Sequence, residues 1–240
     1  MIRTGPPSLF DLQRDVELRG FAIVPGVLNS DEIDGLIADL GAAEEHDAVR
    51  KRQGVYAIRN LLTVVPAVAR LAASDRMLSL VEEALGKKAF PVRGTLFDKT
   101  ADANWLVPWH QDLTICVKER MDVEGYGPWT VKAGVPHVQP PVEVLDEMLA
   151  VRIHLDDCYE RNGALRVLPG THRCGRLTSE QIQAAQKSGG APVVCSVRRG
   201  GALLMKPLTL HASSAAEEPS HRRVIHIDYA SCELAGGLRW

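Results

Sequence analysis

The sequence predicts an α+β fold that is mainly β, in which an antiparallel sheet closes into a barrel or jelly roll. Two observations support this prediction. Residues 1–89 carry apolar side chains mostly at helical spacing, whereas residues 90–230 contain short segments rich in Val, Ile and Leu that are separated by turn residues. Helices that precede the strands in this way are expected to pack on the outside of the sheet.

The first third of the chain is predicted to be mostly helical support. One helix has clear boundaries, because Ser74 is a good N-cap and Gly86 is a good stop, and Met77 and Val81 belong to the apolar stripe between them. Further helices are predicted over residues 9–18, 30–43 and 66–72, and a short strand over residues 20–24.

The rest of the chain is predicted to be strands with one helical interruption, over residues 179–187. Asn162-Gly163 is typical of the two-residue turn of a β-hairpin, and it lies between two of the predicted strands. The predicted strands span residues 91–99, 109–117, 149–156, 164–168, 193–197, 201–206 and 224–229.

Residues 118–147 form a long connection inside this region. The segment is rich in Gly and Pro and starts six residues after Asp112. Long connections of this kind often close over active sites, so we predict a lid loop. A plain surface insertion is the alternative.

The composition indicates one ordinary globular domain over residues 1–240. A net charge of −2 gives no reason to expect nucleic acid or an anionic membrane as a partner. No secretory signal and no apolar run of membrane-spanning length is evident, and the five scattered cysteines favour reduced thiols in the cytoplasm. We expect a monomer or a homodimer that acts on a small molecule.

A His-x-Asp pair indicates where chemistry takes place. On a strand, His110 and Asp112 would point to the same face, which supplies two ligands of a metal site. His211, which follows a later apolar strand, is the candidate third ligand, and Arg222 lies eleven residues beyond it. Two histidines and one carboxylate are the ligand set of non-haem Fe(II) oxygenases. A bare His-x-Asp is weak by itself, and a surface or core pair without metal is the alternative reading.

Several neighbouring side chains have two possible roles. Thr114 shares the parity of His110 and Asp112, so it either hydrogen-bonds a co-substrate or lines the barrel. Arg152 and His154 share one face of a strand and either meet substrate or form a solvated face. A second His-x-Asp, His226 and Asp228, is interpreted as a barrel-lining or core pair, because no downstream histidine completes it.

Four segments, in this order, resemble the phytanoyl-CoA dioxygenase-like branch of the Fe(II)/2-oxoglutarate-dependent oxygenases. They are Asp98-Lys99, Trp109 to Asp112, Asn162 to His172, and His211 through Arg222 to Ile225. The resemblance implies a double-stranded β-helix, a jelly-roll or cupin-like barrel. It places the metal triad on His110, Asp112 and His211, the 2-oxoglutarate-anchoring arginine on Arg222, and a lysine that approaches the co-substrate on Lys99.

The expected function is therefore an Fe(II)- and 2-oxoglutarate-dependent dioxygenase. With O2 it would hydroxylate a small metabolite and release succinate and CO2, and Arg222 offers a planar fork for the distal carboxylate of 2-oxoglutarate. The alternatives are a cupin-like metalloenzyme that does not use 2-oxoglutarate and a non-catalytic metabolite-binding barrel. The sequence shows no evident cluster of cations for a CoA phosphate, so an acyl-CoA substrate is not favoured.

Overall fold

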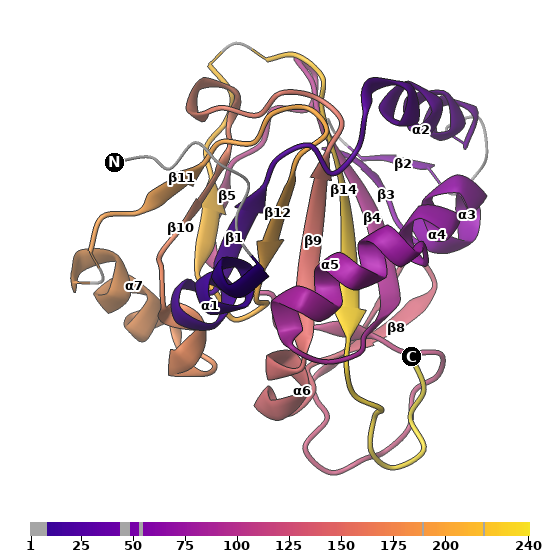
Figure 1. Cartoon of the computed structure of the whole chain (residues 1–240). Helices are drawn as coiled ribbons and strands as arrows, with labels where there is room; N and C mark the ends of the chain where they lie inside the picture. The colour runs from indigo at the N-terminus through magenta and orange to yellow at the C-terminus, as the bar shows by residue number, and fades with distance from the viewer. Residues whose placement is uncertain (1–8, 44–48, 53–54, 189, 218) are drawn as a thin grey trace.

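The computed structural model describes residues 9–43, 49–52, 55–188, 190–217 and 219–240 (Figure 1). The helices are α1 (Leu9–Arg19), α2 (Ser30–Ala43), α3 (Leu61–Val64), α4 (Pro66–Ala72), α5 (Asp75–Leu85), α6 (Val142–Asp146) and α7 (Ser179–Ser188). The strands are β1 (Phe21–Val24), β2 (Val49–Arg52), β3 (Val55–Ile58), β4 (Phe90–Lys99), β5 (Val107–His110), β6 (Ile115–Cys116), β7 (Trp129–Lys132), β8 (Val135–Val138), β9 (Met148–His154), β10 (Leu165–Val167), β11 (Val193–Cys195), β12 (Ala202–Met205), β13 (His211–Ser213) and β14 (Arg222–Ala230).

A large antiparallel sheet forms one wall of the molecule. Its strands run in the order β1-β12-β9-β14-β4-β3-β2, and α1 and α5 lie across its outer face (Figure 1). Along β9, Leu149, Val151 and Ile153 point to the helices and are fully buried in the main core, as strand alternation requires. Each such side chain contributes roughly 2 kcal/mol by leaving water. The helices therefore fix this sheet, and its other face is free to line a cavity.

A second sheet, in the order β11-β10-β13-β5, lies opposite the first and completes a jelly-roll barrel. The cavity between the two sheets is lined by side chains from β4, β9 and β14 on one side and from β5, β10 and β13 on the other. In β5 and β13, His110 and His211 are direct cross-strand partners. The predicted jelly roll with helices outside is confirmed.

The predicted boundaries of the capped helix are also confirmed. The Ser74 hydroxyl accepts a hydrogen bond from the Met77 backbone N–H, and Gly86 ends α5 in the left-handed conformation at φ 70°. The first third also contains two strands that were not predicted, β2 and β3, which extend the large sheet beyond β4. Among the described residues, no helix is long and apolar enough to cross a membrane.

The continuous strand predicted over residues 109–117 is wrong. β5 ends at His110 and β6 begins at Ile115, and β6 belongs to a separate three-stranded sheet with β8 and β7. The chain leaves β5 because the Asp112 backbone N–H donates to Pro207 O at 2.9 Å and the Gln111 amide binds backbone groups of other segments. Apolar periodicity does not report such side-chain tethers.

The predicted Asn162-Gly163 hairpin is wrong as well. Glu160–Asn162 form a 3-10 turn, and β9 and β10 on either side of it belong to different sheets. The Asn162 side chain accepts from the Tyr159 N–H and donates to Asp157 O, so it closes a turn that passes the chain from one sheet to the other. Gly163 takes the left-handed conformation, with φ 79°.

The segment 118–147 is folded rather than irregular. It contains the β7–β8 hairpin, which pairs with β6, and the short helix α6. Val138 of β8 is fully buried in a second apolar cluster that also includes Leu234 and Leu238 from the C-terminal end of the chain. Its many Gly and Pro residues mask this structure in the sequence, because they interrupt the strand periodicity.

Candidate active site

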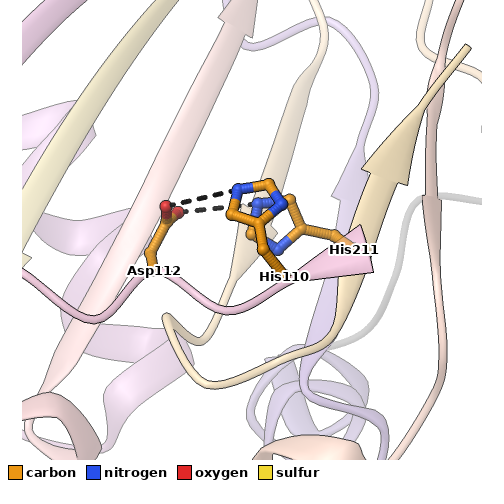
Figure 2. Close-up of side chains that lie close together, drawn as sticks. All are labelled: His110, Asp112 and His211. Atoms are coloured by element: carbon orange, nitrogen blue, oxygen red, sulfur yellow. Dashed lines mark ion pairs between the residues drawn. The ribbon is translucent and has the colours of Figure 1, made fainter. Parts of the chain in front are cut away.

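Three predicted metal ligands lie together beside the β5–β13 strand pair (Figure 2). One ligand atom from each of His110, Asp112 and His211 lies within 4.8 Å of the others. The Asp112 carboxylate is 3.9 Å from His110 Nε2 and 3.7 Å from His211 Nε2, and the two rings are 4.2 Å apart between centroids. Figure 2 shows the carboxylate facing both imidazoles. This spacing suits one metal ion.

Backbone hydrogen bonds fix the tautomer of both histidines. His110 Nδ1–H donates to Pro108 O at 2.8 Å, and His211 Nδ1–H donates to Thr209 O at 2.9 Å. Because each ring spends its proton on Nδ1, each Nε2 presents a lone pair toward Asp112. Burial lowers the pKa of His211 to about 4, so this imidazole is neutral at physiological pH.

Asp112 is positioned by its neighbour rather than by a strand. Gln111 is buried, donates to Gly175 O and Leu208 O, and accepts from the Leu177 N–H, each at 2.8 Å. Desolvation opposes ionisation of Asp112, but the imidazoles around it and Arg93 hold its pKa below the usual value. Asp112 is therefore a carboxylate, the form that binds a metal.

The triad opens into a cavity of about 250 Å³ between the two sheets. Arg222 lines this cavity, and it is only 4% exposed. Its Nη1 donates to Gly163 O and, at 3.7 Å, to Cys158 Sγ, whereas its buried Nε has no partner. Among the described residues no carboxylate pairs with this guanidinium. A buried cation left in this state is suited to an anionic ligand.

Lys99 supports the Arg222 end of the cavity from behind. Its ammonium donates to Ser214 O at 2.5 Å and Ser213 Oγ at 3.3 Å, and it does not line the cavity itself. Burial and the charge of Arg222 lower the pKa of Lys99 to about 8. Ser213, which lies two residues after His211 on β13, does line the cavity, and the sequence reasoning missed it.

A buried polar chain crosses the floor of the cavity. Arg152 donates to His226 Nδ1 at 2.8 Å, His226 Nε2–H donates to Asp228 at 2.9 Å, and Asp228 accepts from Arg93 Nε. Burial opposes the charge of Asp228, but Arg93 and His226 hold its pKa far below the usual range. His226 therefore lines the barrel as predicted. This series of hydrogen bonds fixes the side chains of Arg152 and Arg93.

The other predicted positions separate into two groups. Thr114 and Arg152 line the cavity beside the triad, whereas His154 does not. His154 is buried with no partner on either ring nitrogen, and burial lowers its pKa to about 3. The alternative of a solvated face at Arg152 and His154 is wrong, because both are buried. The cavity-lining residues that the sequence reasoning missed are Arg59, Arg93, Thr95, Phe97, Trp105, Val107, Lys132, Leu165 and Ser213.

Comparisons with known proteins find related sequences and folds. A family model described as phytanoyl-CoA dioxygenase (PhyH) matches residues 16–224. The ectoine dioxygenase of Bordetella bronchiseptica is 22% identical over 172 residues, which cover 68% of this chain and 49% of that protein. A probable alpha-ketoglutarate-dependent hypophosphite dioxygenase of Stutzerimonas stutzeri is 22% identical over 252 residues, covering 92% and 78%. The chain spans about half the length of the Bordetella and Streptomyces ectoine dioxygenases that it matches.

Solved structures show the same fold. The non-heme alpha ketoglutarate dependent epimerase SnoN from nogalamycin biosynthesis superposes with a TM-score of 0.70 at 19% identity, covering 93% of this chain and 82% of SnoN. EctD from S. alaskensis, solved with 2-oxoglutarate and 5-hydroxyectoine, gives a TM-score of 0.69 at 19% identity, covering 96% and 78%.

Proposed function

This chain belongs to the phytanoyl-CoA dioxygenase family, and from that premise we propose that it is an Fe(II)- and 2-oxoglutarate-dependent dioxygenase. It hydroxylates a small-molecule metabolite and releases succinate and CO2. One observation carries the proposal: a His-Asp-His cluster and a buried arginine with no carboxylate partner line the same cavity. The first suits a metal ion and the second suits the anionic end of a co-substrate.

The residues fit the metal. His110, Asp112 and His211 would hold Fe(II) through two neutral Nε2 atoms and one carboxylate, because both Nδ1–H groups are already bonded to backbone carbonyls. This ligand set reduces the charge of Fe(II) to about +1 and leaves coordination positions open. Bound iron and 2-oxoglutarate supply the activation of O2.

The residues also fit the co-substrate. Arg222 would bind the distal carboxylate of 2-oxoglutarate through its guanidinium, since its Nε is buried and unsatisfied. Thr114 and Ser213 offer hydroxyl groups on the cavity wall. Lys99 would add positive charge and orient Ser213 from behind. These groups orient the co-substrate, while the apolar side chains of Phe97, Leu165 and Val107 limit the entry of water.

We further propose that the chain acts as one oxygenase domain in which residues 118–147 cover the site. The support is that Lys132 of β7 lines the cavity although its segment lies outside both barrel sheets. Amide hydrogen exchange would test this role. Exchange across residues 118–147 should slow when metal and 2-oxoglutarate are added, and unchanged exchange would mean a surface insertion.

The remaining assignments are broader. The names of the matched relatives, ectoine dioxygenase and hypophosphite dioxygenase, support a small molecule as the substrate. All five cysteines are free thiols, which supports action in the reducing cytoplasm.

Arg152 would meet the substrate, whereas the buried place of His154 gives it no such contact. We expect a monomer or a homodimer, which light scattering on the purified protein would decide.

The decisive experiment is an anaerobic titration with Fe(II) and then 2-oxoglutarate, followed by visible absorption. A weak charge-transfer band that needs both additions is expected, together with succinate release once O2 is admitted. His211→Ala should lose the band because two protein ligands hold iron poorly, and Arg222→Ala should lose it at moderate 2-oxoglutarate concentrations. Lys187→Ala, which removes an exposed cation on α7, is the matched control and should keep it.

Absence of the band in the iron-loaded native protein would overturn the co-substrate assignment. A cupin-like metalloenzyme that does not use 2-oxoglutarate would then bind iron and turn over without succinate. A non-catalytic metabolite-binding barrel would consume no O2.

A further inference from the structure

We propose that the substrate oxidised at this site carries an anionic group, a carboxylate or a phosphorus or sulfur oxyanion, which Arg59 and Lys132 bind. This inference rests on the proposed function and adds the chemical class of the substrate. Arg59 follows β3 and Lys132 ends β7, and both line the same cavity as the triad.

The two cations lie away from the co-substrate end. In the β4–β14 pair, Arg222 is opposite Lys99 and Asp228 is opposite Arg93. These two cross-strand pairs are six residues apart along the strands, or roughly 20 Å. Arg59 comes directly after Ile58, which pairs with Leu96 in the middle of β4. Burial and then the charges of Arg93 and Arg59 lower the pKa of Lys132, so these three cations share one region.

The other cations of the cavity already have partners or a role. Arg93 forms an ion pair with Asp228, Arg152 donates to His226, and Arg222 is assigned to the co-substrate. Within the described part of the chain, the side chains of Arg59 and Lys132 have no ion pair or hydrogen bond, and Asp112 is the one carboxylate that lines the cavity. Arg59 and Lys132 are therefore the two cavity-lining cations whose side chains have no partner in the described structure.

The charge balance favours an anion even in the loaded site. Fe(II) and the 2-oxoglutarate dianion cancel one another, and Asp112 and Asp228 offset two of the five cavity-lining cations. A surplus of positive charge remains, and Arg59 and Lys132 are its members without a side-chain partner. Like charges that share a partly desolvated region repel, and an anionic group between them relieves that repulsion and forms charge-assisted hydrogen bonds. A neutral substrate would leave the repulsion in place.

The proposal is tested by titrating small anions into protein that is loaded with Mn(II) and saturated with 2-oxoglutarate. This complex cannot turn over. The probes are sulfate and acetate, with acetamide as the uncharged counterpart of acetate, and binding is measured by calorimetry. Sulfate, acetate or both should bind once per chain and acetamide should not. In Arg59→Gln/Lys132→Gln the affinity should fall at least about tenfold, because each lost contact to a charged group is worth roughly that factor.

The matched control is Lys88→Gln/Lys187→Gln, which removes the same charge from two exposed positions outside the cavity. It should bind the anions like the native protein. The relative response to sulfate and acetate distinguishes an oxyanion from a carboxylate. Equal anion binding by the native protein and Arg59→Gln/Lys132→Gln overturns the proposal, and so does a native protein that binds neither anion.

The same titration separates this proposal from the proposed function. The binding of 2-oxoglutarate to the Mn(II)-loaded protein is measured first, and Arg59→Gln/Lys132→Gln should leave it unchanged. If 2-oxoglutarate does not bind, the proposed function fails. The anion titration is then made on the metal-loaded protein alone and still reports on Arg59 and Lys132.

Discussion

Gln111 lies between His110 and Asp112, and its side chain points away from the His-Asp-His cluster. Its side-chain amide ties this short stretch to three separate backbone positions, at Gly175, Leu208 and Leu177. It therefore fixes the point at which the chain leaves β5 and turns Asp112 toward the histidines. Gln111 is a positioning residue, because it contacts neither the metal ligands' donor atoms nor the cavity.

Gln111→Ala should weaken metal binding about 10–100-fold, the usual effect of removing a group that orients a ligand. It should also lower the free energy of unfolding by about 2–4 kcal/mol, because buried backbone groups lose their partners. Calorimetric titration with Co(II) and urea denaturation measure the two effects. Gln186→Ala, which removes an exposed side chain bonded only within α7, is the control. Native-like metal affinity in Gln111→Ala would show that the backbone alone positions Asp112.

Which side chains come together was more predictable than the backbone path that brings them together. Alternation along β14 puts Arg222, His226 and Asp228 on one face, because a strand paired on both sides cannot shift its register without exposing its apolar face. For Asp112 the same argument named a residue that does lie beside the two histidines, although strand alternation does not place it there. The i, i+2 rule applies only inside a strand, and here a side-chain amide outside the pattern decides the path of the chain.

The turn between α1 and β1 braces the segment that carries His211. Gly20 O accepts hydrogen bonds from the Lys206 N–H at 2.8 Å and from the Thr209 hydroxyl at 3.0 Å. Thr209 O in turn accepts the Nδ1–H of His211. The turn between α1 and β1 is thus linked to His211 through Thr209. The link depends on Gly20, because a glycine there leaves room for the Thr209 side chain.

Gly20→Ala should destabilise the protein more than Gly26→Ala and should also weaken metal binding. Both glycines have positive φ, 83° and 63°, so each substitution costs about 1–2 kcal/mol of backbone strain. A Cβ at Gly20 would lie 2.5 Å from Thr209 Oγ1 and 2.5 Å from His172 Nδ1, whereas a Cβ at Gly26 meets nothing within 4 Å. Urea denaturation and Co(II) titration of both variants check this. Equal effects would mean that the turn does not bear on His211.

At the scale of the whole molecule, the sequence predicted the layers better than the connections. The order of helices followed by strands is enough to predict that apolar helix faces pack on one side of a sheet. The main core confirms this packing. The crossing between sheets at Asn162-Gly163 and the β7–β8 hairpin depend on contacts between distant segments. The cations of the cavity show the same limit, because Arg59, Arg93 and Lys132 come from separate elements and form no cluster along the chain.

The buried neutral His154 makes the whole fold sensitive to acid. Its pKa is about 3 in the folded protein and 6.5 ordinarily, so the unfolded chain binds more protons between these values and stability falls as the pH drops below about 6.5. The loss attributable to this residue approaches about 1.4 kcal/mol per pH unit. In metal-free His154→Leu, this part of the loss should disappear. Stability at pH 7 should be equal or higher, because two unpartnered ring nitrogens leave the core. Urea denaturation of both proteins from pH 7 to pH 4.5 measures the difference, and parallel pH curves would show that His154 is protonated in the folded state.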